Sequence, residues 1–263
     1  MIIPFFKYQG TGNDFVLIDQ RVTQYLSRED HKRIAGICDR RFGVGADGLM
    51  LLQNKAGYDF EMIYFNADGR ESTMCGNGGR CITAFARYLG IICDHARFLA
   101  IDGEHLARIN AADKKVELQM SDVRQVEISP DFYVMNTGSP HYVTFVPELE
   151  AFDVYGEGKK IRESARFSAE GINVNFVQKT AEGIEVATYE RGVEDETLSC
   201  GTGVTAAAIS YWLKEGKTEG QEIAVQTKGG ELSVRLESDG YIGFRNIWLT
   251  GPAEQVFEGK IDI

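Results

Sequence analysis

The stretch ESTMCGNG, residues 71–78, returns once in the chain as ETLSCGTG, residues 196–203. Both copies place a Glu, a Ser or Thr, a Cys and two Gly at the same spacing. Each copy follows a strand-like run and precedes a run with helical periodicity, 80–89 in the first half and 204–213 in the second. The repeat therefore predicts two related halves. Each half carries one cysteine, Cys75 or Cys200, where a strand and turn lead into a helix.

A cysteine in this position has a particular chemistry. The first turn of a helix presents backbone N–H groups without intrahelical partners, and the helix dipole adds positive charge there. Such surroundings favour the thiolate, and flanking glycines let the backbone approach a bound anion closely. Each copy of the repeat therefore predicts a reactive thiol beside a carboxylate cradle. Two such units, one on either side of a carbon atom, could remove a proton from one face and return it to the other.

The alternative for each motif taken alone is structural. A cysteine before a helix is usually a small buried residue, and a glycine-rich turn is usually a helix cap. The matching context of the two copies favours function for Cys75 and Cys200. The other three cysteines, Cys38, Cys81 and Cys93, have no such paired context, and we expect them to be mostly buried and inert.

Composition restricts the partners. The 263 residues include 28 basic and 39 acidic side chains, a net charge of −11, which disfavours nucleic acid or an anionic membrane surface. There is no apolar stretch of membrane-spanning length, and the start MIIPFFKYQG does not resemble a secretory signal. Five cysteines without a short CxxC pair favour reduced thiols in the cytoplasm over a disulfide framework or a metal site. We therefore expect a cytoplasmic protein that acts on a small molecule.

The pattern of elements predicts an α+β fold. Helices are expected at 28–39, 80–89 and 204–213, with a further short one within 157–171. Short strands are expected at 2–8, 15–19, 49–53, 58–65, 97–101, 104–109, 115–120, 133–136, 141–146, 172–178, 184–189, 222–227, 231–236 and 241–250. This pattern favours two pseudo-symmetric domains, each a curved antiparallel-rich sheet wrapped around a central helix, at residues 1–120 and 121–250. No low-complexity linker separates them, so we expect the two cysteine turns to be brought together.

The glycine-rich segment GVGADG, residues 43–48, superficially suggests a nucleotide site. A dinucleotide-binding fingerprint would follow a strand and open a helix, whereas here a strand-like run follows. The segment is therefore expected to be a tightly turned or functional loop.

Over essentially its whole length the chain resembles the diaminopimelate epimerase family. The motifs that carry the resemblance, in the family's order, are GTGNDF (10–15), GVGADG (43–48), FNADG (65–69), MCGNGGRC (74–81), GSPH (138–141), NVNF (173–176), YERG (189–192) and ETLSCGTG (196–203). The resemblance implies a cofactor-independent, pyridoxal-free enzyme that interconverts L,L- and meso-diaminopimelate in lysine and peptidoglycan precursor biosynthesis. It also implies a homodimer, and a final strand that returns to the first domain, to which residues 251–263 are therefore assigned.

The resemblance also implies roles for individual residues. Cys75 and Cys200 correspond to the acid–base pair, one as thiolate and the other as thiol, with the roles exchanged for the other stereoisomer. The substrate-binding positions correspond to Asn13, Asn66, Gly76, Asn77, Asn173, Glu190, Arg191, Gly201 and Thr202, with His141 and Ser139 in support. For Glu190 and Arg191 the structural alternative is a surface ion pair. The planar fork of an arginine nevertheless suits a substrate carboxylate.

Two positions depart from the commonest family pattern. Gly48 stands where many members carry Gln, and Ser139 stands where many carry Asn. A serine can still form a hydrogen bond but reaches less far. The departures bear on recognition of the distal group of the substrate, and they leave the two thiols intact.

Three other functions remain open. A proline racemase or hydroxyproline epimerase of the same fold would resemble MCGHG and DRSPCGTG, whereas this chain has Asn77 and ETLSC at those places. A non-catalytic amino-acid-binding protein could use the same glycine-rich cradles, but two reactive thiols would expose it to oxidation. A cysteine hydrolase would need a base beside its nucleophile, and His141 is the candidate that a motif supplies.

Overall fold

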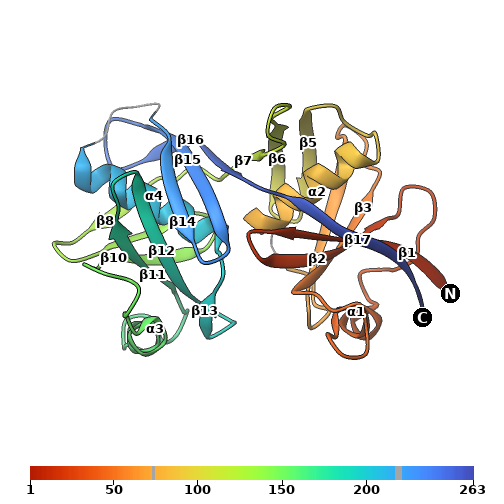
Figure 1. The fold of residues 1–263 in the computed structure, drawn as a ribbon, viewed down its shortest axis with the longest axis horizontal. Helices are drawn as coiled ribbons and strands as arrows, with labels where there is room; N and C mark the ends of the chain where they lie inside the picture. Colours follow the sequence, from red (N-terminus) through yellow and green to blue (C-terminus); the bar gives the residue numbers. More distant parts are fainter. Residues whose placement is uncertain (73–74, 217–220) are drawn as a thin grey trace. The chain divides into compact units, whose positions relative to one another are not determined.

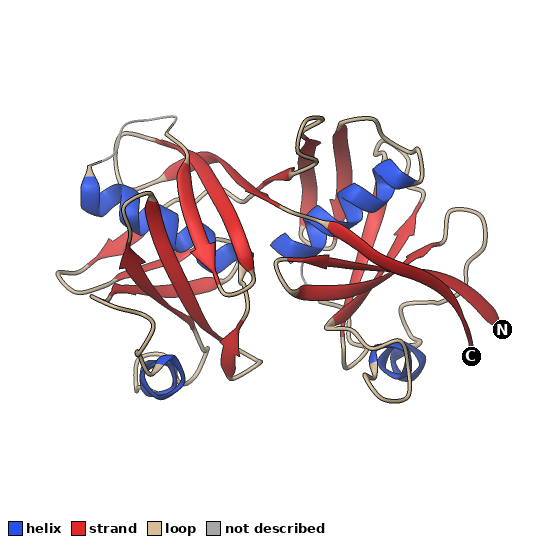
Figure 2. Ribbon diagram, viewed as in Figure 1, coloured by secondary structure: helices blue, strands red, loops and turns tan. Residues whose placement is uncertain are grey.

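The computed structural model describes residues 1–72, 75–216 and 221–263. Thr73 and Met74 of the first cysteine motif lie outside the described residues. The chain forms two compact units, Met1–Leu118 with Pro252–Ile263, and Gln119–Gly251. In Figure 1 the first unit carries the red to yellow elements and the dark blue C-terminal strand, and the second carries the green to blue elements. Each unit combines a sheet with one long and one short helix (Figure 2).

The first unit is built on a mixed sheet. Its elements are β1 (Ile2–Gly10), β2 (Asn13–Asp19), α1 (His31–Cys38), β3 (Gly48–Gln53), β4 (Phe60–Asn66), α2 (Gly76–Tyr88), β5 (His95–Ala100), β6 (Gly103–Ile109), β7 (Val116–Gln119) and β17 (Glu254–Asp262). The strands run in the spatial order β17, β1, β2, β3, β4, β5, β6, β7. The pairs β2–β3 and β4–β5 are parallel, and the other pairs are antiparallel.

The second unit repeats this plan. Its elements are β8 (Val126–Ile128), β9 (Tyr133–Asn136), β10 (Pro140–Phe145), α3 (Val154–Arg162), β11 (Asn173–Lys179), β12 (Gly183–Glu190), β13 (Asp195–Thr197), α4 (Gly201–Glu215), β14 (Ile223–Thr227), β15 (Gly230–Ser238) and β16 (Phe244–Gly251). The pairs β10–β11 and β12–β14 are parallel, and the remaining neighbours are antiparallel.

The two units share their connections as well as their content. A parallel pair requires a crossover, which is commonly a helix. In the first unit α1 connects β2 to β3, and α2 connects β4 to β5. In the second unit α3 connects β10 to β11, and α4 lies on the connection from β12 to β14. The sequence repeat is thus a topological repeat, and both cysteines precede the helix of the second parallel crossover.

Each long helix is enclosed by the sheet of its own unit. The helix α2 contacts β17 and β1 at one end of the strand order and β6 near the other end. The helix α4 likewise contacts strands from β9 to β16. A sheet can touch one helix with both of its ends only if it curls around that helix. The predicted fold class is confirmed, and the curled sheets hold the start of each long helix in a fixed place.

The burial of α4 follows from its sequence. Small and apolar residues fill the run VTAAAIS, residues 204–210, and all of them are buried. A helix that is apolar on every side must be surrounded by protein. The helix ends at Gly216, which has the left-handed φ of 61° that glycine adopts at little cost. The shorter α1 instead buries one face, through Ile34, Ile37 and Cys38.

Several elements differ from the sequence expectation. The helix α2 begins at Gly76, four residues before the predicted start, because its first turn is the glycine-rich run GNGG. The helix α1 begins at His31 instead of residue 28, since the Asp30 carboxylate accepts hydrogen bonds from the backbone and hydroxyl of Ser27 and closes a turn there. The strand pattern did not predict the three-residue strands β8 and β13. The terminal strand β17, which only the family resemblance implied, pairs with β1.

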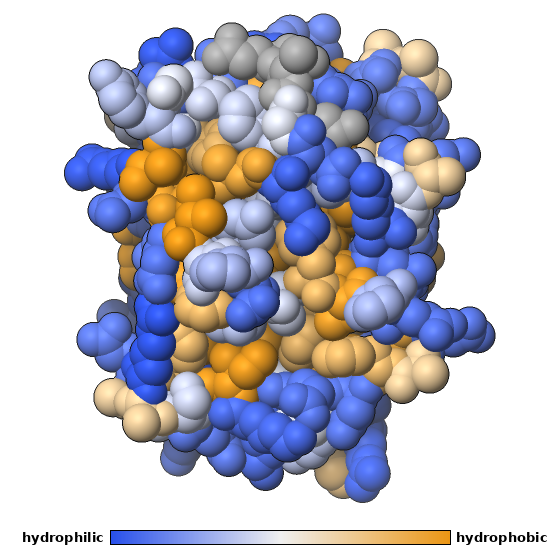
Figure 3. Space-filling view, turned by 90° about the vertical axis from the view of Figure 1, so that its left-hand side faces the viewer, coloured by the Kyte–Doolittle hydropathy of each residue, from blue (hydrophilic) through white to orange (hydrophobic). Residues whose placement is uncertain are grey.

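A face of the second unit is shown in Figure 3, where apolar areas are broken up by polar side chains. The exposed large apolar side chains of this unit include Ile128, Tyr155, Val193, Leu198 and Tyr241. Among the described residues, no helix combines the length and the apolar character needed to cross a membrane.

Candidate active site

Cys75 is the N-cap residue of α2. Its backbone is extended, with φ −98° and ψ 131°, and its carbonyl oxygen accepts the first helical bond from Gly79, at 2.7 Å. The side chain is half-buried, whereas the following Gly76 and Asn77 are buried. The sulfur therefore lies at the positive end of a thirteen-residue helix, beside its first N–H groups.

Two asparagine side chains adjoin this sulfur. The Cys75 sulfur lies 3.6 Å from Oδ1 of Asn13, and the Asn77 side-chain amide lies 3.4 Å from the same oxygen. Asn13 donates its own amide hydrogen to the Asp47 carboxylate, at 2.6 Å. An ionised carboxylate only accepts, so Asp47 fixes which end of the Asn13 amide faces the cysteine. The structure thus brings together the predicted residues Cys75, Asn13 and Asn77.

Arg80 contacts Asn77 of this group and is fully buried. Its guanidinium donates to Oδ1 of Asn77 at 3.1 Å, to Oγ1 of Thr11 at 3.2 Å and to the carbonyl of Gly76 at 3.4 Å. Burial lowers the pKa of the Arg80 guanidinium, while the adjacent Cys81 and Cys75 act in the opposite direction. Arg80 therefore holds the Asn77 amide in one orientation and adds positive charge near the thiol, a role that the sequence analysis missed.

Cys200 occupies the same place in the second unit. It is the N-cap of α4, with φ −118° and ψ 111°, and its carbonyl accepts from Val204 at 2.8 Å. Its sulfur lies 3.4 Å from Oγ1 of Thr202, and that hydroxyl lies 2.9 Å from Nε2 of His141. Three residues that the sequence analysis selected are therefore joined in one chain of contacts.

His141, the last residue in this series of contacts, is buried and is uncharged near neutral pH. Burial, with a further contribution from the positive charge of Arg191, lowers its pKa to about 3. The ring contacts the Asn175 amide through Nδ1, at 3.0 Å. Asn175 also donates to the carbonyl of Tyr142 at 2.9 Å. The sequence analysis missed Asn175, although strand periodicity places it on the same face as Asn173.

Asn173 and Ser139 lie beside the histidine. The Asn173 amide nitrogen donates to Oγ of Ser139 at 2.8 Å and to the carbonyl of Pro140 at 3.1 Å. Its oxygen accepts from the backbone N–H of Arg191, at 2.9 Å. Asn173 and Ser139, both predicted for the site, are therefore in contact with each other. The hydroxyl of Ser139 accepts this hydrogen bond in spite of the short reach of its side chain.

The remaining predicted residues lie toward solvent. Arg191 is exposed, and its guanidinium donates to the carbonyl of Glu170 at 3.0 Å. Glu190 is half-buried at the end of β12. Asn66 is exposed at the end of β4, opposite Gly48, and the described residues form no hydrogen bond to its side chain. The structure places Asn66 in the same unit as Cys75.

Gly48, one of the departures from the family pattern, has no room for a side chain. A β-carbon there would lie 2.5 Å from the carbonyl oxygen of Phe65 and 2.6 Å from the Tyr64 ring. Tyr64 thus fills the space that a glutamine would need in this chain.

The other cysteines behave in two ways. Burial raises the pKa of both Cys38 and Cys81 to about 12, so these thiols stay protonated, as expected of inert residues. The expectation that Cys93 is buried is wrong. Cys93 is exposed because it lies in the turn that follows α2.

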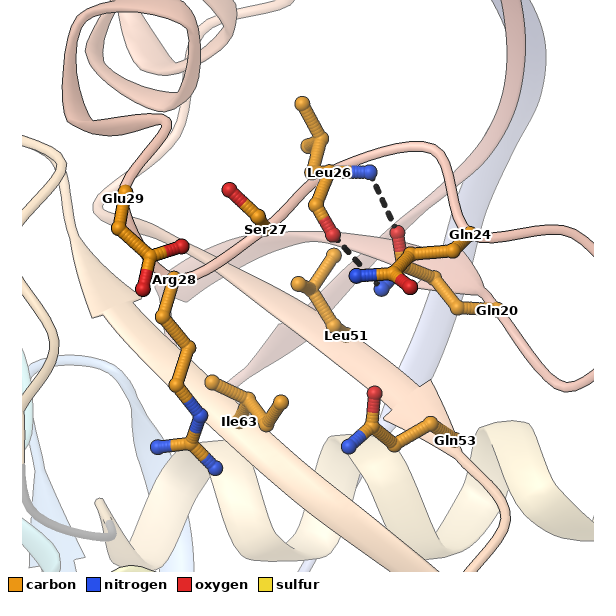
Figure 4. A pocket seen from close by; sticks show the side chains of 9 residues that line it. All are labelled: Gln20, Gln24, Leu26, Ser27, Arg28, Glu29, Leu51, Gln53 and Ile63. Carbon is orange, nitrogen blue, oxygen red and sulfur yellow. Dashed lines mark hydrogen bonds between the residues drawn. The ribbon is translucent and has the colours of Figure 1, made fainter.

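A separate cavity of about 230 Å³ lies in the first unit (Figure 4). Its wall includes Gln20, whose side-chain amide donates to the carbonyl of Leu26 and accepts from the N–H of the same residue. The wall also includes Arg28, which forms ion pairs with Glu61 and Glu71. None of the predicted site residues lines it. Within residues 1–72, 75–216 and 221–263, no cluster of His, Cys, Asp or Glu is arranged to hold a metal ion.

Comparison with known proteins places the chain in a family. The model of the family "Diaminopimelate epimerase" matches residues 5–126 and 133–256. A diaminopimelate epimerase of Flavobacterium psychrophilum is 51% identical over 260 residues, covering 98% of this chain and 100% of that protein. One of Chlorobaculum tepidum is 40% identical over 266 residues, covering 97% of this chain and 99% of that protein.

Solved structures share the fold at lower identity. A phenazine biosynthesis protein of the PhzF family from Bacillus anthracis has a TM-score of 0.80 at 14% identity, with full coverage of both chains. A hydroxyproline epimerase from Agrobacterium vitis has a TM-score of 0.71 at 14% identity, covering 99% of this chain and 92% of that one. At such identities the likeness concerns the fold alone. On the matched residues and the 51% identity over 98% of its length, the chain belongs to the diaminopimelate epimerase family.

Proposed function

We propose that the chain is an epimerase that interconverts L,L- and meso-diaminopimelate without a cofactor, in lysine and peptidoglycan precursor biosynthesis. The observation that carries the proposal is the equivalent position of Cys75 and Cys200 in the two units. Each is the N-cap of the equivalent crossover helix in two topologically equivalent units. The family membership, at 51% identity over nearly the whole chain, supports the same reaction.

In this proposal the two thiols act as base and acid. A thiolate removes the proton from the α-carbon, and the thiol of the other unit delivers a proton to the opposite face. The carbanion is thereby inverted, the two sulfurs exchange protonation states, and the reverse reaction starts from the exchanged form. The mechanism requires both sulfurs to reach the same carbon atom from opposite sides. Proton transfer is most effective when the pKa of the base lies near the working pH, and a thiol at a helix start meets that condition.

Each unit offers groups that suit parts of the substrate. The first N–H groups of the two long helices, at Gly76, Asn77, Gly201 and Thr202, suit the α-carboxylate, where negative charge grows during proton removal. The polar groups of Asn13, Asn66, Asn173, Glu190 and Arg191 suit the remaining amino and carboxylate groups. Arg191 is exposed and Glu190 precedes it at the end of β12, so the two charges suit a substrate with a second charged end.

The test is incubation of the purified protein with L,L-diaminopimelate in heavy water, followed by chiral analysis. The expected result is meso-diaminopimelate with deuterium at the inverted α-carbon. Cys75→Ser and Cys200→Ser should each lower the rate by orders of magnitude, because serine is a far weaker base near neutral pH. Cys93→Ser, at an exposed cysteine of the first unit, is the matched control and should keep full activity.

Three results would contradict the proposal. Retention of activity in either active-site variant would exclude the two-thiol mechanism. Turnover of proline or hydroxyproline in place of diaminopimelate would favour the alternative within the same fold. Binding of diaminopimelate without α-proton exchange would identify an amino-acid-binding protein instead.

The proposal also includes a homodimer in the cytoplasm. The support is the family resemblance for the dimer, and the five cysteines, all of them free thiols, for a reducing compartment. Light scattering on the eluting protein measures the mass directly, and a monomer mass at working concentration would remove the dimer from the proposal.

A further inference from the structure

The polar contacts around Cys200 have a direction that can be worked out from one end. The carbonyl of Tyr142 can only accept a hydrogen bond, so the Asn175 group that lies 2.9 Å from it is the amide nitrogen. The Asn175 oxygen then faces Oγ1 of Thr188, at 2.9 Å, and accepts from that hydroxyl. The orientation of the Asn175 amide is thereby fixed, with its second hydrogen directed at His141.

Asn175 in turn fixes the tautomer of the histidine. Its amide nitrogen lies 3.0 Å from Nδ1 of His141, so Nδ1 accepts a hydrogen bond and carries no proton. In a neutral imidazole the proton then resides on Nε2. Nε2 lies 2.9 Å from Oγ1 of Thr202, and the hydroxyl oxygen therefore accepts from the ring.

The Asn173 amide does not donate a hydrogen bond to Nε2 of His141. Its amide nitrogen lies 3.5 Å from Nε2 of His141, but its two hydrogens are directed at the closer Ser139 hydroxyl and Pro140 carbonyl. Its orientation is set independently by the backbone N–H of Arg191, which donates to the Asn173 oxygen. The N–H of Nε2 is thus left to Thr202.

A hydroxyl that accepts from the ring still has its own hydrogen to donate. The sulfur of Cys200 lies 3.4 Å from Oγ1 of Thr202, within reach of that hydrogen. We infer that Thr202 donates a hydrogen bond to the Cys200 sulfur, directed by Asn175 through His141, and that these three residues hold Cys200 as a thiolate before substrate binds. A hydrogen bond donated to the charged form of a group favours that form. Asn175, His141 and Thr202 are, in this respect, positioning residues for the base.

Cys75 is the natural comparison within the same chain. Its sulfur faces Oδ1 of Asn13, an acceptor that Asp47 holds in place, so the hydrogen bond there runs from the thiol to the oxygen. The arrangement around Cys200 has the opposite polarity. Substitution of Asn175, His141 or Thr202 should therefore change the ionisation of Cys200 and leave that of Cys75 unaltered.

Other ionisable groups of the second unit could influence Cys200. They are His141 on β10, Glu190 and Arg191 at the end of β12, Glu196 on β13, and Lys228, which pairs with Glu196 at 2.6 Å. Removal of the Thr202 hydroxyl adds or deletes no charge among these groups, and of them only His141 loses a hydrogen-bond partner. A neutral substitution at Thr202 therefore isolates the contribution of the hydrogen bond.

The first measurement is the pH dependence of alkylation in the substrate-free protein. Iodoacetamide reacts with thiolates, and peptide mass spectrometry quantifies Cys75 and Cys200 in the same sample. In Thr202→Val the alkylation rate of Cys200 below its midpoint should fall about tenfold, the loss expected for one hydrogen bond to a charged group. Thr202→Ser keeps the hydroxyl and should restore the rate.

The matched control is Thr205→Val. Thr205 lies one turn along the same helix, and its hydroxyl donates to the carbonyl of Gly201, at 2.9 Å. This variant should leave the alkylation of Cys200 unchanged. An equal fall in Thr205→Val, or an unchanged rate in Thr202→Val, would overturn the inference.

The second measurement is made on the wild-type protein, and a variant serves only to assign its signals. Two-bond proton–nitrogen correlation spectra distinguish the two histidine tautomers, and the chain has only four histidines. His141→Gln identifies the signals of His141. The Nε2–H tautomer is expected across pH 5–8, and the Nδ1–H tautomer would overturn the inference. The inference rests on the proposed function only where it gives Cys200 the role of catalytic base. Failure of epimerase activity would leave these two ionisation results standing, and their failure would leave the epimerase proposal standing.

Discussion

Oδ1 of Asn175 occupies the space next to Gly203, where an added β-carbon would lie 2.4 Å away. The asparagine cannot withdraw, because its oxygen accepts from Thr188 and its nitrogen donates to Tyr142 and His141. A glycine at this point of the cysteine motif therefore lets α4 start close against β11. The same packing that fixes the helix start also fixes the amide that orients the histidine.

Gly203→Ala should therefore destabilise the protein by about 2 kcal/mol or more, the usual cost of overpacking a rigid site. Gly78→Ala, at the equivalent place in the first unit, meets only the terminal methyl of Met50, a flexible group, and should cost less. Gly36→Ala is the control, since nothing lies within 4 Å of a β-carbon there in the exposed face of α1. It should be neutral or stabilising by roughly 0.5–1 kcal/mol. Urea unfolding of the three variants measures the order, and equal losses at positions 36 and 203 would contradict it.

The buried His141 should make stability fall in mild acid. Its pKa is about 3 in the folded protein, below the ordinary 6.5, so the unfolded chain binds the proton first. Stability contributed by this group is present above pH 6.5 and is lost as the pH falls toward 3. Between pH 6.5 and 5 the loss should approach about 2 kcal/mol.

His141→Gln should remove that part of the pH dependence, whereas His95→Gln, at an exposed ring, should keep it. The measurement is urea unfolding at pH 7.5 and 5.0 for the three proteins. A slope that is identical in the wild type and in His141→Gln would show that another group is responsible.

Arg80→Met should cost about 2–4 kcal/mol of stability, because buried oxygens of Asn77, Thr11 and Gly76 lose a charged donor. The turnover number should fall as well, since the Asn77 amide loses its anchor. Arg87→Met, in the last turn of the same helix, is the control and should cost under about 1 kcal/mol. Thermal unfolding and kinetics of both variants decide the question, and a stable, fully active Arg80→Met would show that the buried charge has no role.

Arg191→Ala should lower kcat/KM for diaminopimelate by about 30-fold or more, the loss of roughly 2 kcal/mol of charged hydrogen bonding. Arg191→Lys keeps the charge without the planar fork and should remain impaired. Stability should change little, because Arg191 is exposed. Arg166→Ala removes another exposed arginine of the same unit, one that pairs with Glu127, and should leave the kinetics unchanged. Normal kinetics in Arg191→Ala would assign that residue to the surface.

Much of the architecture is readable from local pattern. The alternation of apolar residues located most of the strands, and the repeat of the cysteine motif identified two equivalent halves. The misses have local reasons too. The first turn of α2 consists of GNGG, which has low helix propensity, and its helical state depends on packing inside the curled sheet. The short β8 and β13 offer too few residues for a periodic signal, and each depends on a neighbouring strand.

The candidate site, like the fold, is partly determined by local sequence and partly by tertiary contacts. The sequence by itself determined that Cys75 and Cys200 stand at helix starts, because a glycine-rich turn between a strand and a helix is a local property of eight residues. Only the tertiary structure decided which side chains surround the sulfurs. The parallel register of β10 and β11 sets His141 beside Asn173, and α4 then brings Thr202 to the ring across about sixty residues of chain. The direction of a hydrogen bond depends on every donor and acceptor in contact with it, and those contacts exist only once distant strands have paired.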